Sequence, residues 1–225
     1  RSPSRGLGDV YKRQVVAWDE AYRQADARIA QLTLDEKISF MRGYSSFFFY
    51  GVPEKGMPYI YLSDATQGVH LRNNLPDSTM VRQLERSTAF PCPIMLASSF
   101  DPELAFRYAE AVGEECRAGG IEVLLGPGLN IARNSQCGRN FEYYSEDPLL
   151  SGKCGAAMVR GIQSQGVGTS VKHFAANNQE SMRLQNDARV SQRALREIYL
   201  RGFEIAVKEG RPWTCLLYTS DAADE

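Results

Sequence analysis

Two Asp-Pro pairs, at residues 101–102 and 147–148, constrain the fold of this 225-residue chain more than any other feature. Aspartate accepts hydrogen bonds from the free amides of a helix's first turn, and proline suits the first helical position, so each pair predicts a helix start. An apolar run, typical of a strand buried on both faces, follows each predicted helix. The pattern therefore predicts helices that reach about residues 116 and 165, followed by strands over 121–125 and 167–171.

The rest of the chain continues this alternation. Apolar residues at helical spacing predict a helix from Trp18 to about Gln31, and the capping box TLDE at residues 33–36 predicts the start of a second helix. Further strands are expected over 59–62 and 93–97, and a last helix over 191–209. Alternating strands and helices indicate an α/β fold in which crossover helices join parallel strands.

Two architectures contain such units, a closed barrel and an open doubly wound sheet, and periodicity alone does not choose between them. Polar residues that suit ligand binding follow three different strands, at Asp64, in the loop 126–139 and at Lys172-His173. A barrel gathers such residues at the carboxyl ends of its strands, whereas an open sheet concentrates its site at one switch point. About four to five strands are present where a complete barrel has eight, so we expect a partial (β/α)8 TIM-like barrel with an unpaired edge.

The charge balance argues against nucleic acid and membrane partners. The formal net charge is −1 and the pI is about 6.2, which leaves no basic excess to attract either surface. No apolar run reaches the roughly 20 residues that span a bilayer, and residues 1–14 lack the apolar segment of a secretory signal. The near-zero net charge is consistent with a small neutral ligand.

The five cysteines are irregularly spaced, and only two histidines accompany them, so no metal site is predicted. We interpret them as reduced thiols that serve mostly in packing. Together with the missing signal, they favour a cytoplasmic location.

Both ends of the chain differ from its middle. Residues 1–14 are basic and aperiodic, and residues 215–225 begin abruptly after a strand-like segment. Both resemble translated adapter sequence, with ordinary flexible termini as the alternative. We interpret both ends as artefactual and place the barrel domain at residues 15–214.

Two charged residues stand where strands give way to loops. The Asp64 carboxylate could accept hydrogen bonds from two adjacent sugar hydroxyls, but a turn-forming or helix-capping role fits its spacing equally well. The Arg139 guanidinium could span vicinal hydroxyls or orient a carboxylate. A structural ion pair with Glu142 or Glu146 is the alternative for Arg139.

Lys172 and His173 end an apolar strand, so one side chain should face the barrel axis and the other should pack beside it. A lone histidine is more often structural than catalytic. The neighbouring Lys172, the asparagines at 177–178 and Glu180 favour a functional role here.

Two other enzyme classes fit the sequence poorly. A dinucleotide-binding loop at residues 126–128 would need a third glycine where the chain has Ile131, which weakens the case for a nicotinamide-dependent oxidoreductase. The serines at positions 98, 99 and 170 lack a nucleophile-elbow context, which argues against a Ser-His-Asp hydrolase.

Five motifs occur in order along the chain: SD at 63–64, GPGLNI at 126–131, GRNFEYYSEDP at 138–148, KHFAANNQE at 172–180 and RALREIYL at 193–200. Together they resemble the N-terminal barrel domain of glycoside hydrolase family three, closest to its bacterial β-glucosidase branch. The similarity spans residues 15–214. It implies that Asp64, Arg139, Lys172 and His173 bind the terminal sugar of a small β-glucoside or oligosaccharide, with no metal or cofactor.

The resemblance also implies exo-acting, retaining hydrolysis by two carboxyl groups about 5 Å apart. The family's nucleophile is an aspartate in a Ser-Asp-Trp-like motif on a later strand, and its acid/base is commonly a glutamate from a following domain. Neither motif occurs before Thr214. We expect the missing C-terminal part of the chain to supply both groups, and the fragment alone to be inactive.

This chain departs from the family pattern in two places. Family members usually carry SDGPxGxR, whereas residues 63–70 read SDATQGVH, which puts His70 where an arginine helps to hold the sugar, with Arg72 as a substitute. The AANN loop at 175–178 disfavours the branch that cleaves N-acetylglucosamine. A non-catalytic carbohydrate-binding or sensory protein on a degenerate barrel is the alternative function.

Overall fold

The strands form one sheet in the order in which they occur along the chain. A computed structural model describes residues 17–64, 67–71, 84–183 and 185–217. The strands are β1 (Gly43–Ser45), β2 (Phe48–Phe49), β3 (Ile60–Asp64), β4 (Val123–Leu125), β5 (Gly168–Phe174) and β6 (Thr214–Leu217). Strands β3 to β6 run parallel, and the short β1 and β2 extend the β3 edge in antiparallel fashion.

The strand order identifies the architecture. An open doubly wound sheet reverses its strand order at a switch point, whereas β3, β4, β5 and β6 follow one another without a reversal. Consecutive parallel neighbours are the arrangement of a (β/α)8 barrel. The structure thus confirms the predicted partial TIM-like barrel.

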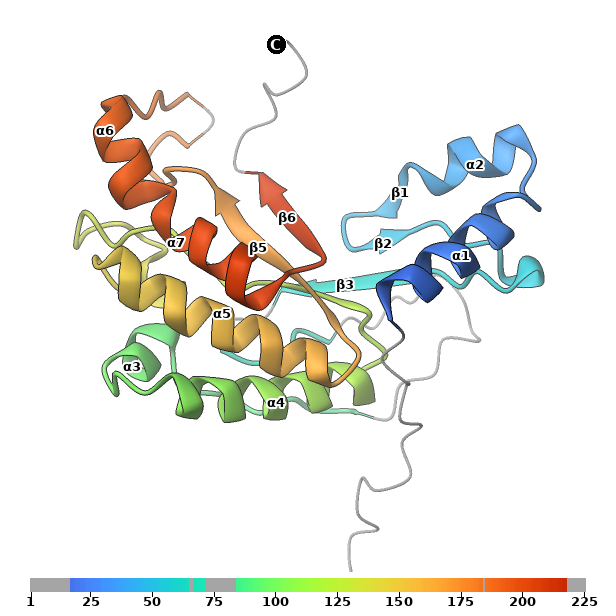
Figure 1. Cartoon of the computed structure of the whole chain (residues 1–225), viewed down its shortest axis with the longest axis horizontal. Helices are drawn as coiled ribbons and strands as arrows, with labels where there is room; N and C mark the ends of the chain where they lie inside the picture. Colours follow the sequence, from blue (N-terminus) through green and yellow to red (C-terminus); the bar gives the residue numbers. More distant parts are fainter. Residues whose placement is uncertain (1–16, 65–66, 72–83, 184, 218–225) are drawn as a thin grey trace, which may run out of the picture.

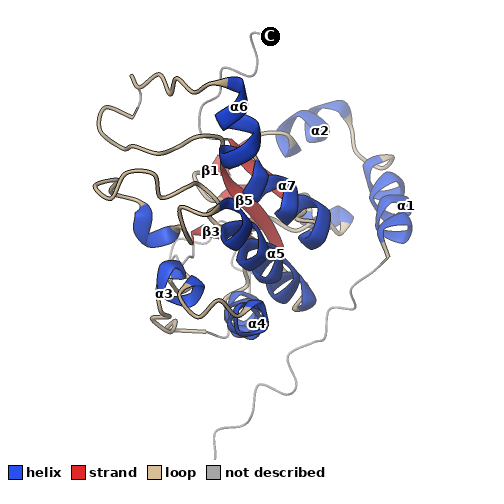
Figure 2. Cartoon of the chain, turned by 60° about the vertical axis from the view of Figure 1, so that its left-hand side comes forward, coloured by secondary structure: helices blue, strands red, loops and turns tan. Residues whose placement is uncertain are grey.

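Two long helices cover one face of the sheet. Helix α4 (Pro102–Ala118) packs against α5 (Pro148–Ser164), and α7 (Arg201–Ile205) packs against α5 on the other side (Figures 1 and 2). The close approach of α4 and α5 depends on Gly161, where a Cβ atom would lie 2.5 Å from both the Ala109 Cβ and the Phe106 carbonyl oxygen. The core between sheet and helices is continuous and includes Tyr61, Leu124, Val171, Val112, Val159 and Ile162.

The predicted helix caps are present. Asp101 Oδ1 accepts hydrogen bonds from the amides of Glu103 (2.9 Å) and Leu104 (3.2 Å), and Asp147 Oδ1 accepts one from the Leu149 amide (2.7 Å). Each aspartate satisfies donors that have no partner inside the helix. The cap and the proline after it explain why both helices begin where the sequence predicts.

The expected last helix forms as a broken one. Its parts are α6 (Gln192–Ala194) and α7, with π-helical turns at 195–199 and 206–210. The helical region as a whole therefore runs from residue 192 to residue 210.

The N-terminal helices lie beside β1 and β2, away from the α4–α5 layer (Figure 1). Helix α1 (Trp18–Ile29) is followed by α2 (Leu34–Phe40). The capping box is confirmed: Thr33 Oγ1 accepts from the Glu36 amide (3.3 Å), and the Thr33 amide donates to Glu36 Oε2 (2.7 Å). These reciprocal bonds fix the start of α2.

The strand expected over 93–97 is wrong, because these residues form the short helix α3 (Pro93–Ala97). Pro93 occupies the first helical position and has no amide to give to a sheet ladder. Pro93, Leu96 and Ala97 are buried, whereas Ile94 and Met95 are exposed. That spacing is helical, and a run of only five apolar residues does not distinguish it from a strand.

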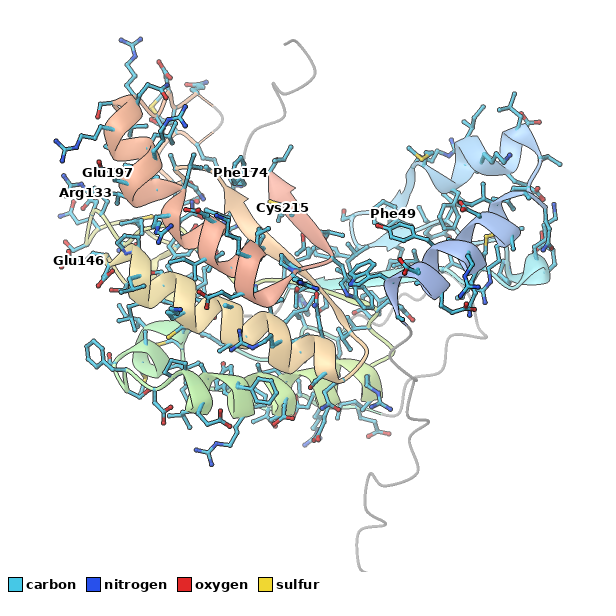
Figure 3. All side chains as sticks on the ribbon, in the orientation of Figure 1. Phe49, Arg133, Glu146, Phe174, Glu197 and Cys215 are labelled. Carbon is cyan, nitrogen blue, oxygen red and sulfur yellow. The ribbon has the colours of Figure 1, made fainter. Side chains whose placement is uncertain are left out.

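The end of the sheet differs from the expected boundaries. Strand β5 continues to Phe174, so Lys172 and His173 lie within the strand, and β6 crosses the boundary that we drew at residue 214. Phe174 and Cys215, labelled in Figure 3, lie on these two last strands. Within the described residues, β6 pairs only with β5, so its other edge carries unpaired backbone groups. The expected N-terminal segment, and the tail beyond residue 217, lie outside the described residues.

No helix in the described part of the chain is long and apolar enough to cross a membrane.

Candidate functional site

Four of the five predicted site residues line a single cavity. Asp64, His70, Arg139 and Lys172 surround a space of about 390 Å³ at the carboxyl ends of the parallel strands, in the company of Gln67, Gly68, Phe141 and Glu142. Asp64 is the last residue of β3, and Lys172 lies near the end of β5. Arg139 comes from the loop after β4. Three segments far apart in sequence thus meet at the face where a barrel places its ligands.

Backbone pairing brings the loop after β4 to β5. The Lys172 amide donates to the Pro127 carbonyl oxygen (3.0 Å), and the Leu129 amide donates to the Lys172 carbonyl oxygen (2.6 Å). Gly128 pairs with Lys172 as an isolated parallel bridge. The segment 126–128 therefore acts as a backbone connection beside Lys172.

Lys172 is a buried cation with two carboxylates near it. The residue is 2% exposed, and its Nζ lies 3.0 Å from Glu142 Oε2 and 3.9 Å from Asp64 Oδ1. An ammonium removed from water is strongly destabilising unless it is paired. The two carboxylates meet that requirement while the side chain still lines the cavity.

Arg139 forms the ion pair that the sequence offered as its structural alternative, and it also lines the cavity. Its Nε donates to Glu142 Oε1, and one terminal nitrogen lies 3.7 Å from Glu180 Oε1. Burial opposes the charge, but the hydrogen bond and the negative charge of Glu142 outweigh it and raise the pKa of the guanidinium. Glu146, the other carboxylate considered, lines a different cavity.

His173 is not among the residues that line the cavity of Lys172. It is 4% exposed, and its Nδ1 lies 3.1 Å from the Tyr143 hydroxyl and 3.3 Å from Asn130 Oδ1. Asn130 also clamps the His173 backbone, accepting from its amide (2.8 Å) and donating to its carbonyl oxygen (2.9 Å). Burial, followed by the positive charges of Arg139 and Lys172, lowers the pKa of His173 far below its usual value. The imidazole is therefore neutral.

A chain of polar contacts joins His173 to Arg139. Asn177 Nδ2 donates to the Tyr143 hydroxyl (3.2 Å) and to Glu180 Oε1 (2.9 Å), and Glu180 in turn lies beside Arg139. Tyr143 itself contacts His173. The motifs at 138–148 and 172–180 thus form one connected polar network that reaches the cavity at Arg139.

Sequence reasoning missed the central role of Glu142. It was considered only as a structural partner of Arg139, yet it is 3% exposed and joins both cations of the cavity. The sequence signal is its position three residues after Arg139, directly before Tyr143 and Tyr144, which the structure buries. Residues Arg139 to Glu142 form a single helical turn, which brings the two side chains to the same side.

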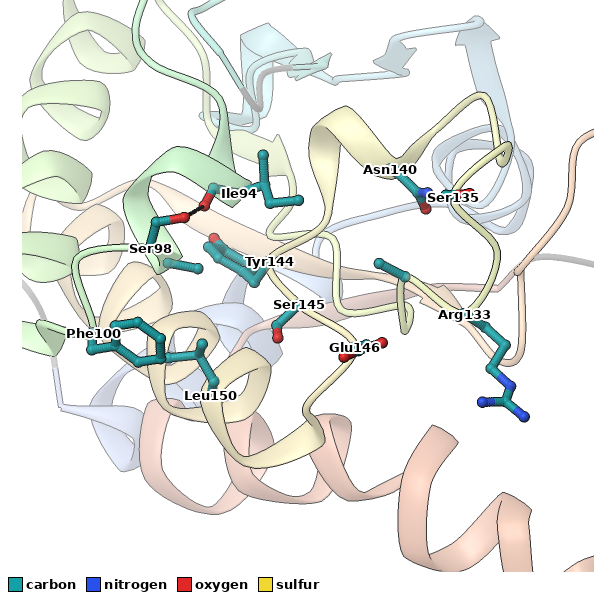
Figure 4. A pocket seen from close by; sticks show the side chains of 12 residues that line it. Ile94, Ser98, Phe100, Arg133, Ser135, Asn140, Tyr144, Ser145, Glu146 and Leu150 are labelled. Carbon is teal, nitrogen blue, oxygen red and sulfur yellow. Dashed lines mark hydrogen bonds between the residues drawn. The ribbon is translucent and has the colours of Figure 1, made fainter.

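A larger cavity of about 650 Å³ lies between α3, the loop after β4 and the start of α5 (Figure 4). One side is apolar, with Ile94, Phe100 and Leu150, and the polar side chains include Arg133 and Glu146. None of the predicted site residues lines it. Size alone therefore does not identify the functional site, and the smaller, charged cavity is the candidate.

Comparison with known proteins agrees with the fold and the motifs. A family described as "Glycosyl hydrolase family 3 N terminal domain" matches residues 77–212. The chain is 45% identical over 188 residues to thermostable beta-glucosidase B of Acetivibrio thermocellus, an alignment that covers 84% of this chain and 25% of that protein. It is 49% identical over 191 residues to an exo-alpha-(1->6)-L-arabinopyranosidase of Bifidobacterium breve, with coverage of 84% and 25%.

A solved structure supports the same relationship. Beta-glucosidase 3B from Thermotoga neapolitana, in complex with alpha-D-glucose, superimposes with a TM-score of 0.75 at 44% sequence identity. The match covers 88% of this chain and 30% of that one. The chain thus spans a quarter to a third of the length of these relatives. On the family match and these identities together, the chain belongs to glycosyl hydrolase family 3, within the family's N-terminal domain.

Proposed function

We propose that this chain is the N-terminal, sugar-binding part of a longer retaining, exo-acting β-glycosidase that hydrolyses terminal β-D-glucosyl residues. The observation that carries the proposal is the meeting of Asp64, Arg139 and Lys172 on one cavity of about 390 Å³. A sugar ring presents adjacent hydroxyl groups that both donate and accept. Charged donors and a charged acceptor on one wall suit it, because hydrogen bonds to ionised groups are the stronger ones.

Each lining residue has a role in this proposal. Asp64, whose side chain is half exposed, accepts hydrogen bonds from adjacent hydroxyls, while Arg139 and Lys172 donate to them. His70 lies at the same wall and adds an imidazole. His173 also remains a predicted hydroxyl ligand, and because Tyr143 and Asn130 occupy its Nδ1, its Nε2 is the atom for that contact.

The reacting carboxyl groups of this proposal come from outside the chain. Both oxygens of Glu142 are engaged by cations, Oε1 by Arg139 and Oε2 by Lys172, which removes Glu142 as a nucleophile or proton donor. We infer that a later barrel strand supplies the nucleophile and a following domain the acid/base. Without them, binding of ground-state sugar does not lower the barrier to glycoside cleavage, so the chain alone is inactive.

A pentopyranoside is the second candidate substrate. The relative at 49% identity is named an exo-alpha-(1->6)-L-arabinopyranosidase, and the relative at 45% a beta-glucosidase. The first name refers to removal of a terminal sugar residue, and the second refers to hydrolysis of a glucoside. Asp64, Arg139 and Lys172 are the proposed ligands of ring hydroxyls, which both sugars carry.

The test is to express the full-length reading frame that contains this chain and to assay it on aryl β-D-glucoside and aryl α-L-arabinopyranoside. We expect hydrolysis of the glucoside, with the β-anomer of glucose as the first product in ¹H NMR, because retention is the outcome of a double displacement. A full-length protein that binds glucose but cleaves neither glycoside would support the non-catalytic alternative instead.

A further inference from the structure

Glu142 is a buried carboxylate that the proposed reaction does not use directly. It ends the turn Asn140–Glu142, and the residue is 3% exposed. An unpaired carboxylate at such a depth is strongly destabilising. Its two oxygens have different partners: Oε1 accepts from Arg139 Nε, and Oε2 lies 3.0 Å from Lys172 Nζ.

The pairing leaves donors free for a ligand. A guanidinium carries five N–H donors and an ammonium three, and Glu142 engages only the Nε donor of Arg139 and one contact with Lys172. Both cations line the cavity together with Glu142. A carboxylate held between them fixes the separation and direction of the two donor groups, which would otherwise repel each other.

The pairing also sets the charge of the cavity. Among the residues that line the cavity, Arg139 and Lys172 carry two positive charges and Glu142 and Asp64 two negative charges. Glu180, 3.7 Å from Arg139, lies outside this lining. The cluster of four is formally neutral. If Glu142 lost its charge, the cavity would become cationic and would attract anions.

We propose that Glu142 is a positioning residue that holds Arg139 and Lys172 as hydrogen-bond donors and cancels their charge, so that the cavity selects neutral over anionic sugars. This inference rests on the proposed function of the cavity as a sugar site. It adds that Glu142, whose two carboxylate oxygens each face a cation, sets the selectivity against a uronic acid.

The test measures competitive inhibition of the full-length enzyme by D-glucose and by D-glucuronate, a neutral and an anionic sugar. In Glu142→Gln, which keeps the shape and removes the charge, we expect the inhibition constant for glucose to rise about tenfold. We expect the constant for glucuronate to stay unchanged or to fall, so that the ratio of the two constants shifts at least about tenfold toward the anion. Glu146→Gln, in the same loop but at the other cavity, should leave the ratio unchanged.

Two further variants keep the test decisive if Glu142→Gln does not fold. Glu142→Asp retains the charge on a shorter side chain and should keep the wild-type preference for glucose while weakening binding of both sugars. Lys172→Met removes one positive charge and should shift the ratio in the opposite direction, away from glucuronate. Equal changes for both sugars in Lys172→Met, or in a folded Glu142→Gln, would reduce Glu142 to a structural residue and overturn the inference. A changed preference in Glu142→Asp would overturn it as well.

The failure of this inference is distinguishable from that of the proposed function. A wild-type enzyme that hydrolyses the glucoside, with a ratio unaffected by Glu142→Gln, would refute only the role of Glu142. A wild-type protein that neither hydrolyses aryl glycosides nor is competed by glucose would refute the sugar site itself.

Discussion

The ammonium group of Lys172 lies 3.0 Å from Oε2 of Glu142, and both side chains are almost completely buried. Lys172 is contributed by β5 and Glu142 by the loop after β4, so this ion pair joins two of the segments that build the cavity. A surface ion pair of the same type is worth little, because water screens it. At this depth, loss of one partner leaves the other charged group with too little compensation for its removal from water.

Replacement of Glu142 by alanine is therefore expected to lower the free energy of unfolding by about 3–5 kcal/mol, because it leaves the buried ammonium of Lys172 with only the more distant, half-exposed Asp64 as a partner. Glu209→Ala is the matched control. It breaks the exposed pair of Lys153 and Glu209, whose side chains are 46% and 41% exposed, and should change stability by less than about 1 kcal/mol. Thermal denaturation of the full-length protein measures both, and equal effects would contradict the prediction.

The pH dependence of stability should carry a contribution from His173. The pKa of this imidazole is lowered in the folded protein, so below about pH 6.5 the unfolded chain binds a proton that the folded chain does not. The contribution of His173 to the free energy of unfolding is thus fully present above about pH 6.5. It is lost as the pH falls, by at most about 1.4 kcal/mol per pH unit.

Variants separate this contribution from the titration of carboxylates. His173→Asn should show a smaller loss of melting temperature between pH 7 and pH 5.5 than the wild type, whatever its stability at pH 7. His70→Asn, at an exposed position, should retain the wild-type acid-side loss. An identical pH profile for His173→Asn and wild type would show that His173 accepts its proton in the folded state.

The packing of α4 on α5 predicts that alanine substitutions at two glycines differ in their effect on stability. Gly161→Ala would place a Cβ atom 2.5 Å from the Phe106 carbonyl oxygen, and because backbone cannot move aside cheaply, we expect a loss of about 1–3 kcal/mol. Gly138→Ala meets no heavy atom within 4 Å and should be close to neutral. Melting temperatures of the two variants check this, and a stable Gly161→Ala would mean that the helices can separate.

The parts of the fold that local chemistry dictates were predictable from the sequence. Asp101 and Asp147 cap their helices as expected, since a capping aspartate followed by proline leaves the backbone few alternatives. Residues 93–97 were misassigned because five apolar residues support a strand or a helix equally, and only tertiary packing decides. The limit of β5 was also missed, because a strand buried on both faces tolerates polar residues that find partners across the sheet.

The candidate site, like the fold, could be predicted only in part from the sequence. Asp64 and Lys172 could be selected because they stand at strand ends, and Arg139 because it lies in the polar loop after a strand; parallel strands bring such segments together. The pairing of Glu142 with two cations could not be predicted, because it depends on the approach of β5 to a loop some 30 residues earlier in the sequence. Sequence spacing gave equal weight to Glu146, which lines the other cavity.

The most direct test of the sugar site is the kcat/KM of Lys172→Ala in the full-length enzyme on an aryl β-D-glucoside. Lys153→Ala removes an exposed lysine of α5 that lines neither cavity, and it serves as the control. Circular dichroism verifies that both variants fold. We predict that Lys172→Ala lowers kcat/KM at least about tenfold, equivalent to about 1.4 kcal/mol of transition-state stabilisation, while Lys153→Ala leaves it unchanged. A folded Lys172→Ala enzyme with wild-type kinetics would contradict the assignment of this cavity as the sugar-binding site.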